Sequence, residues 1–252
     1  MTSVGNLRVK IFADGADFDG IMNMYANPMI KGFTTNPTLM RKAGVTDYEA
    51  FARKVLAAVP DRPVSLEVFA DDFDEMERQA LAIASWGRNV NVKIPVTNTK
   101  REFAGPLIRK LSAAGVALNV TAVFTLDQVR RVTECLAEDA SAIVSVFAGR
   151  VADTGIDPVP LMAEAVQILE ARPKAELIWA SPRELLNVFQ ADAIGCHIIT
   201  VTNDIIAKLS LVGKDQHDYS LETVRMFHRD ATAAAYSIDT SGAIAQPKRA
   251  VG

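Results

Sequence analysis

The chain has 252 residues, of which 49% are hydrophobic and 23% charged, and this is enough apolar material for one sizeable core. Its formal net charge of -3, without a long basic run, argues against nucleic acids and anionic membranes as partners. There are only two cysteines and three scattered histidines, and neither an apolar leader nor a membrane-spanning run is visible. We therefore expect a cytoplasmic protein without a disulfide framework or a metal site.

Short runs of β-branched and apolar residues predict eight strands. They span residues 9–13, 32–35, 64–70, 90–96, 116–124, 142–148, 176–180 and 196–201. Between them, apolar residues recur at helical spacing, most clearly over 47–59, 74–86, 103–114, 126–137, 158–171 and 182–192. This alternation predicts the α/β class and a single-domain (β/α)8 TIM barrel, with an open doubly wound sheet as the alternative.

Two further segments follow the eighth predicted strand. Residues 203–212 and 220–237 have helical spacing, so we expect an extra C-terminal helix. Residues 239–252 lack periodicity and are expected to form a disordered tail. The predicted domain therefore covers residues 1–238.

A lysine interrupts one of the most apolar predicted strands. Lys93 lies within the sequence VNVKIPVT. Strands of a parallel barrel are covered on both sides, and loss of water disfavours an ammonium ion and frees the amine to attack a carbonyl. Lys93 is therefore a candidate nucleophile. A structural pair with a carboxylate inside the barrel, or a side chain that extends from the strand end to solvent, is the alternative.

Two carboxylates also occur in strand contexts. Asp14 ends the first predicted strand and Glu67 lies within the third, between apolar residues. A buried acid either pairs with a cation or has a raised pKa that suits it to proton transfer. Both are candidate acid–base residues. The alternatives are that Asp14 caps the next helix and that Glu67 is only the structural partner of Lys93.

Other strand ends carry polar side chains that could bind a substrate. Asn36, Asn119 and Thr121 could hydrogen-bond hydroxyl groups or orient a water molecule, although the same residue types also form turns and caps. Arg150 follows the sixth predicted strand, and Ser181 and Arg183 follow the seventh. Two arginines and a hydroxyl in the loops after the sixth and seventh strands of a barrel suggest a phosphate site. The alternative is that both arginines are solvated surface residues.

Taken together, these segments resemble the transaldolase family from the first strand to the eighth. FADGAD is similar to the family's strand-one element, GFTTNPTLM to its Thr-Thr-Asn-Pro element, and VNVKIPVT to its lysine motif. The resemblance implies that Lys93 forms a Schiff base and that Asp14 is the acid–base residue of carbon–carbon cleavage. It also implies that Asn36 and Asn119 bind substrate hydroxyls or stabilise the carbinolamine.

The resemblance continues into the sixth and seventh strands. SVFAGR is similar to the family's strand-six element, which implies that Ser145 and Phe147 contact the substrate and that Arg150 binds its phosphate. WASPRE is similar to the strand-seven Ser-x-Arg, so Ser181 and Arg183 are expected to complete that site. The loop from 145 to 158 is not a close copy of common members, which leaves open whether the headgroup is a phosphate or another anion.

Three residues, Glu67, Phe147 and Asn119, bear on which activity of the family is expected, and all three resemble those of true transaldolases. The short chain resembles the small-barrel branch that also contains fructose 6-phosphate aldolase, whose aldolases carry Gln and Tyr where this sequence has Glu67 and Phe147. The implied reaction is transfer of a dihydroxyacetone unit between sugar phosphates, in which Glu67 moves protons through a water held by Thr121. The resemblance implies no metal, no organic cofactor and a homo-oligomer. An aldolase that releases dihydroxyacetone, and a non-catalytic sugar-phosphate-binding barrel, are the alternatives.

Overall fold

The computed structural model describes residues 4–241. Positions 242–252 of the predicted tail lie outside the described residues. The chain divides into two compact units, one that ends at Ser210 and one that begins at Leu211. They are described separately below.

The first unit is a closed barrel of eight parallel strands, each paired with the next in sequence and the last with the first. The strands are β1 (Lys10–Asp14), β2 (Ile30–Thr34), β3 (Val64–Glu67), β4 (Val90–Pro95), β5 (Leu118–Val123), β6 (Ala142–Val146), β7 (Ala175–Trp179) and β8 (Ile198–Val201). The closed order β1 to β8 confirms the predicted (β/α)8 fold and is incompatible with an open doubly wound sheet.

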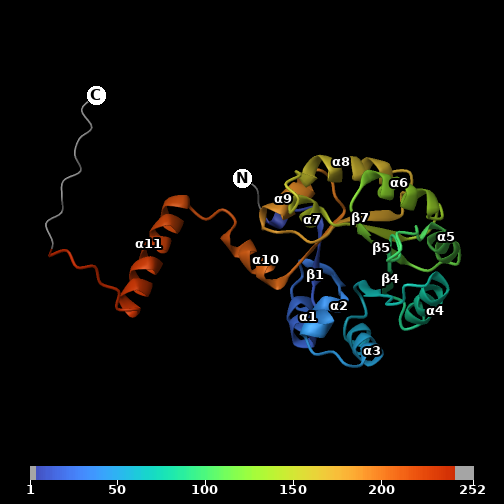
Figure 1. Ribbon diagram of the computed structural model, residues 1–252, viewed down its shortest axis with the longest axis horizontal. Coiled ribbons are helices and arrows are strands. Elements are labelled where there is room, and N and C mark those ends of the chain that lie inside the picture. The colour runs from blue at the N-terminus through green and yellow to red at the C-terminus, as the bar shows by residue number, and fades with distance from the viewer. Residues whose placement is uncertain (1–3, 242–252) are drawn as a thin grey trace. The chain divides into compact units, whose positions relative to one another are not determined.

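Helices surround the strands, as Figure 1 shows. They are α1 (Phe18–Tyr25), α2 (Pro37–Lys42), α3 (Tyr48–Ala58), α4 (Phe73–Ala84), α5 (Gly105–Ala113), α6 (Leu126–Cys135), α7 (Ala148–Ala152), α8 (Pro158–Leu169), α9 (Leu186–Ala193) and α10 (Asn203–Ala207). Short 3-10 turns lie at Val4–Asn6 and Lys208–Leu211. Most of the longer helices begin at an Asp or Thr whose side chain accepts a backbone N–H of the first turn, as Asp47 does before α3 and Thr125 before α6.

The helices and strands share one apolar core, and a second, smaller cluster fills the barrel. The inner cluster contains Phe12, Ile143, Ile178, Ala180 and Ile198. The ring of Phe12 lies against Gly32, where an added Cβ would be 2.5 Å from a ring carbon. The middle of the barrel is therefore packed, and open space is left at its two ends.

Several element boundaries differ from the predicted ones for local reasons. β3 ends at Glu67 rather than at position 70, because the Phe69 and Ala70 amides donate to the side chain of Gln79 instead of to a neighbouring strand. The helix predicted from position 182 begins at Leu186, since the amides before it donate to the Asn187 side chain.

The second unit contains the expected C-terminal helix, α11 (Gln216–Ala233). It begins four residues earlier than predicted, because Asp215 accepts hydrogen bonds from the first-turn amides. None of its residues is buried, and its exposed side chains include Leu221, Val224 and Phe227. Among the described helices of the whole chain, none combines the length and apolar character that crossing a membrane requires.

Candidate active site

A polar cavity of about 550 Å³ opens at the carboxyl ends of the barrel strands. Every site residue predicted from the sequence lines it except Asn119, which lies just beneath. The predicted lining residues come from β1, β3, β4, β5 and β6 and from the loops after β2, β6 and β7. The barrel fold thus brings together side chains that are up to 169 positions apart in the sequence, counting from Asp14 to Arg183.

Lys93 lies in the centre of this constellation. Its neighbours in register are Glu67 on β3 and Asn119 on β5. Although it carries an amine, Lys93 is only 6% exposed, and its Nζ donates a 2.8 Å hydrogen bond to the Thr35 carbonyl oxygen. An amine held in this way has a fixed position and little contact with bulk water, and both favour attack on a bound carbonyl group.

Glu67 is the ion-pair partner of Lys93. Its Oε2 lies 3.0 Å from the Lys93 Nζ, and its side chain is 18% exposed, so it is less enclosed than the lysine. The Tyr48 hydroxyl donates a 3.0 Å hydrogen bond to the Glu67 carbonyl oxygen and supports this strand end from α3. This is the pair with a carboxylate that was given as the alternative to a nucleophilic Lys93. The same contact provides a route for a proton between the amine and the carboxylate.

Asp14 lies at the end of β1 and faces the same cavity. One carboxylate oxygen accepts a 2.8 Å hydrogen bond from the Thr34 hydroxyl, and the other is 3.4 Å from the Asn36 amide nitrogen. Burial raises the pKa of Asp14 above its usual value, and the hydrogen bond from Thr34 and the charge of Lys93 oppose that rise. Asp14 does not cap α1, because the side chain that accepts the first-turn amide is that of Asp17.

Asn36 has two contacts. Its Oδ1 caps α2 by accepting the Leu39 amide at 2.9 Å, and its Nδ2 faces Asp14. The structure therefore confirms the cap and places Asn36 on the cavity lining, and the predicted contact with a substrate stays a prediction. The proline that follows, Pro37, occupies the first turn of the helix, where no N–H donor is needed.

Asn119 is fully buried beneath the cavity and is part of a hydrogen-bonded chain. The Ser145 hydroxyl donates to its Oδ1 at 2.7 Å, and its Nδ2 donates to the Ser65 hydroxyl at 3.0 Å. The chain fixes the orientation of the amide, so that Asn119 is held next to Lys93 in register. Ser145 itself lines the cavity.

The hydroxyl of Thr121 is buried, and it has no hydrogen-bond partner among the residues that the structure describes. Thr121 lines the cavity near the end of β5, where pairing with β6 is irregular between Val120 and Val123. The next residue, Ala122, has a φ of 59°, a conformation that non-glycine residues rarely adopt. An unpartnered hydroxyl on a residue that lines a cavity is suited to hold a water molecule or a substrate oxygen.

The loops after β6 and β7 supply the arginines. Arg150 lies in α7, with its guanidinium carbon 5.2 Å from the centre of the Phe147 ring. Arg183 donates two hydrogen bonds to the Asp153 carboxylate, one of them 2.8 Å long from Nε. Both arginines are exposed at the cavity mouth, and Asp153 is a neighbour that the sequence analysis did not anticipate.

A close backbone approach joins the two arginine loops. Ser181 has a φ of 59°, and a Cβ added at Gly149 would lie 1.5 Å from the Ser181 carbonyl oxygen. The Gly149 amide donates to the Ala180 carbonyl oxygen at 3.3 Å. Only a glycine permits this contact, which holds Ser181 against the loop that carries Arg150.

Sequence reasoning missed further residues of the site and its support. Thr34, Thr200 and Lys42 line the cavity, and Ser65 holds Asn119. The Thr34 and Thr200 hydroxyls are 2.5 Å apart and extend the hydrogen-bond chain from Asp14 across β1, β2 and β8. Serine and threonine are common in strands, so only their order at successive strand ends could have singled them out.

Groups of three or more His, Cys, Asp or Glu side chains placed to hold a metal ion do not occur within residues 4–241. The two cysteines, Cys135 and Cys196, are separately buried and free.

Comparisons with known proteins show the family of the chain. Residues 11–246 match the model of the family described as "Transaldolase/Fructose-6-phosphate aldolase". A "Probable transaldolase" of Dehalococcoides mccartyi is 37% identical over 202 residues, which cover 80% of this chain and 90% of that protein. A protein of the same description from Methanococcus maripaludis is 34% identical, with coverage of 80% and 89%. Among solved structures, a 2,3-dimethylmalate lyase covers 94% of this chain and 88% of its own with a TM-score of 0.53, but at 12% identity it bears on the fold alone.

Proposed function

Because the chain belongs to the transaldolase/fructose-6-phosphate aldolase family, we propose that it is a transaldolase that uses Lys93 as its Schiff-base nucleophile. The reaction transfers a dihydroxyacetone unit from a ketose phosphate, such as fructose 6-phosphate or sedoheptulose 7-phosphate, to an aldose phosphate. The observation that carries the proposal is a buried amine on a barrel strand, paired with one carboxylate, Glu67, in a cavity that a second carboxylate, Asp14, also lines.

The first proposed step is attack of the Lys93 amine on the ketone carbon. Glu67 lies 3.0 Å from the Lys93 Nζ and accepts the proton that the ammonium loses. The carbinolamine then loses its hydroxyl group as water, and the proton for that departure returns from Glu67 through a water molecule. The unpartnered hydroxyl of Thr121 supports a place for that water. The product is an iminium ion between Lys93 and the substrate.

Asp14 carries out the proposed cleavage step. Its carboxylate takes the proton of the C4 hydroxyl as the C3–C4 bond breaks, and the bonding electrons pass into the iminium to give an enamine. The raised pKa of Asp14 suits it to return the proton to the aldehyde oxygen when the enamine attacks the acceptor. The iminium is the electron sink, so this reaction requires neither a metal nor an organic cofactor.

The remaining site residues are proposed to hold the substrate. Asn36, Asn119 and Ser145 are placed to bind hydroxyl groups near the amine. Arg150, with Ser181 and Arg183, is proposed to bind the anionic headgroup at the cavity mouth, because guanidinium groups match the geometry of phosphate oxygens.

The second candidate is an aldolase of the fructose 6-phosphate aldolase type, which hydrolyses the enamine intermediate and releases dihydroxyacetone. Transfer is favoured by Phe147, which lines the cavity without a hydroxyl that could hold a second water molecule. It is also favoured by Glu67, whose carboxylate lacks the fixed N–H donor that a glutamine would offer at this position.

Reductive trapping tests the proposal. Sodium borohydride added with fructose 6-phosphate is expected to inactivate the enzyme and to attach a three-carbon adduct to Lys93, as peptide mass spectrometry would show. Lys42 also lines the cavity and is the matched control. Lys93→Met should abolish the adduct, and Lys42→Met should retain it. An adduct on Lys42 in the wild-type enzyme, or inactivation without an adduct, contradicts the assignment.

We further propose a cytoplasmic homo-oligomer. The support is the set of apolar side chains on α11, among them Leu221, Val224 and Phe227, which are 45%, 59% and 63% exposed. Exposed apolar surface of this kind is typical of subunit interfaces. Sedimentation equilibrium of the wild type and of a Val224→Asp, Phe227→Asp variant tests this proposal, which requires the variant to dissociate.

A further inference from the structure

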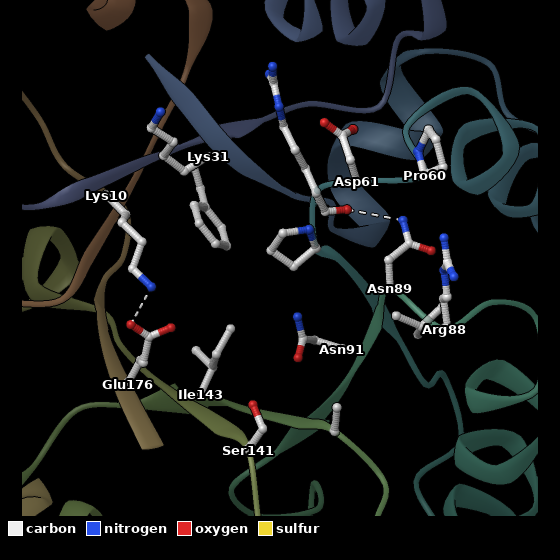
Figure 2. Close-up of a pocket in the computed structure, with 15 residues that line it drawn as sticks. Lys10, Lys31, Pro60, Asp61, Arg88, Asn89, Asn91, Ser141, Ile143 and Glu176 are labelled. Atoms are coloured by element: carbon white, nitrogen blue, oxygen red, sulfur yellow. Dashed lines mark hydrogen bonds and ion pairs between the residues drawn. The ribbon is translucent and has the colours of Figure 1, made fainter. Parts of the chain in front are cut away.

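A second cavity, of about 570 Å³, opens at the opposite end of the barrel, where the strands begin. Figure 2 shows it, with the Asn91 carboxamide extending from β4 into the central space. Its volume falls within the roughly 300–1,000 Å³ typical of small-molecule sites. The packed layer of Phe12 and Ile143 lies between this cavity and the proposed active site, so the two cavities are separate.

Asn91 shows that the base of this cavity is polar. The residue is only 8% exposed, and its side chain has no hydrogen-bond partner among the described residues. The polar atoms of this side chain face the open cavity, since among the described residues the fully enclosed side-chain atoms without a partner belong to Thr121 and Trp179. A buried amide that faces an open cavity is therefore placed to bind a molecule that enters it.

The charged side chains around the opening are mostly cationic. They are Lys10, Lys31, Arg62 and Arg88, against Asp61 and Glu176. Lys10 is neutralised by Glu176 at 2.5 Å, and Asp61 accepts a 2.6 Å hydrogen bond from the Tyr25 hydroxyl.

The other three cations have no carboxylate partner in an ion pair within residues 4–241. Lys31 and Arg62 contact only backbone carbonyl oxygens and, for Arg62, the ring of Tyr25. Arg88 has no hydrogen-bond partner in the described part of the chain. Lys31 and Arg88 are exposed, so they leave positive charge at the opening, above the Asn91 amide that faces the cavity.

From this arrangement we infer that the cavity binds a small phosphorylated polyol or a similar organic phosphate. Its phosphate binds at the cationic opening, where Arg88 has no hydrogen-bond partner among the described residues, and a hydroxyl group reaches the Asn91 amide. A phosphate monoester carries about -1.5 to -2 charges at neutral pH, which complements an opening with two more cations than anions. Phe12, Pro63 and Ile143 provide apolar walls for the carbon chain.

The test separates this cavity from the proposed active site, which is also expected to bind phosphate. Calorimetric titration with glycerol 3-phosphate is carried out on an Arg150→Ala, Arg183→Ala protein, in which phosphate binding at the other end of the barrel is weakened. Saturable binding with a stoichiometry of one supports the inference. Absence of heat up to millimolar ligand overturns it.

Variants of the opening identify the site. In the same background, Lys31→Ala with Arg88→Ala should weaken binding about tenfold, as expected for two exposed charge contacts. The control is Arg53→Ala with Arg78→Ala, which removes the same charge from the outer surfaces of α3 and α4. An equal loss of affinity in both proteins would show that binding depends only on general charge attraction, and this would overturn the inference.

Two probes test the ligand class. Asn91→Leu should weaken binding of glycerol 3-phosphate more than that of inorganic phosphate, because only the polyol reaches the amide. A thermal-unfolding scan of this variant establishes that it is folded, and if it is not, Asn91→Ser takes its place. Succinate is the carboxylate comparison. If succinate binds and glycerol 3-phosphate does not, the phosphate assignment is wrong.

Discussion

Replacing the two arginines at the cavity mouth should have unequal effects. Arg150 has no carboxylate partner in an ion pair among the described residues, and its guanidinium stacks near Phe147. Arg183 is held by two hydrogen bonds to Asp153. To bind a phosphate, Arg183 must share or give up that carboxylate, whereas Arg150 is free to bind. We therefore expect Arg150→Ala to impair binding of phosphorylated substrates more than Arg183→Ala does.

The size of the effect follows from the contacts. A charge-assisted hydrogen bond from Arg150 to a phosphate is worth roughly 1.5–3 kcal/mol, which corresponds to about a ten- to hundredfold rise in KM. Arg183→Ala should raise KM by the lower end of that range, about tenfold, because its charge is already partly compensated by Asp153. Asp153→Asn should lower KM, since it removes a carboxylate that repels the phosphate.

Steady-state kinetics with fructose 6-phosphate and with unphosphorylated fructose as donors check this reasoning. KM for the phosphorylated donor should rise while kcat changes little, because headgroup contacts bind the ground state and transition state alike. KM for fructose should stay nearly constant. Arg130→Ala, an exposed arginine paired with Glu164 on the outer helices, is the control. Equal losses with both donors would show that the mouth arginines are structural or that the headgroup is misassigned.

Three further predictions address the rest of the site. Asp14→Asn should abolish turnover yet increase the free energy of unfolding at neutral pH. Because the pKa of Asp14 is raised in the folded state, its contribution to wild-type stability is greatest below the unfolded-state pKa and is lost as pH rises through the folded-state pKa. Urea titrations should therefore show that the gain of the variant vanishes in acid, and a gain independent of pH would contradict this. Gly149→Ala should cost about 1–3 kcal/mol of stability, whereas Gly15→Ala, whose Cβ meets nothing within 4 Å, should cost less; equal costs would refute the close-contact argument. Phe147→Tyr should increase dihydroxyacetone release relative to transfer. A shift of ~1.4 kcal/mol in the relative barriers of the two reactions changes the product ratio about tenfold. If the wild type already releases more dihydroxyacetone than it transfers, the aldolase proposal replaces the transaldolase one.

The fold could be predicted because the sequence patterns that specify it are local and repeat along the chain. Each strand is a short apolar run, and each crossover has helical spacing, so errors of a few residues at the ends did not change the topology. Lys93 and Glu67 could be singled out because charged side chains are rare in strands covered on both faces. Their chemical contrast with the surrounding residues is visible without a structure.

The contacts between loops could not be predicted in the same way. Arg183 and Asp153 lie 30 positions apart on different loops, and no spacing rule connects them. The hydrogen bonds of Ser65 and Thr34 likewise depend on strand register, which the sequence does not specify to the residue. The sequence identified which residue types meet at the strand ends, and the structure shows which of them are already paired with one another.

The end of the barrel that holds the proposed active site also contains two residues with strained backbone conformations. Ala122 and Ser181 both have φ values of 59° at the ends of β5 and β7, a conformation that costs a non-glycine residue about 1–3 kcal/mol. Each is held by its surroundings, Ala122 by the irregular pairing of β5 with β6 and Ser181 by the contact over Gly149. The residue before Ala122 carries the unpartnered Thr121 hydroxyl, and Ser181 lies in the loop of Arg183. Strain and the buried carboxylate of Asp14 therefore lie together at one end of the barrel, where stability is given up to hold reactive groups in position.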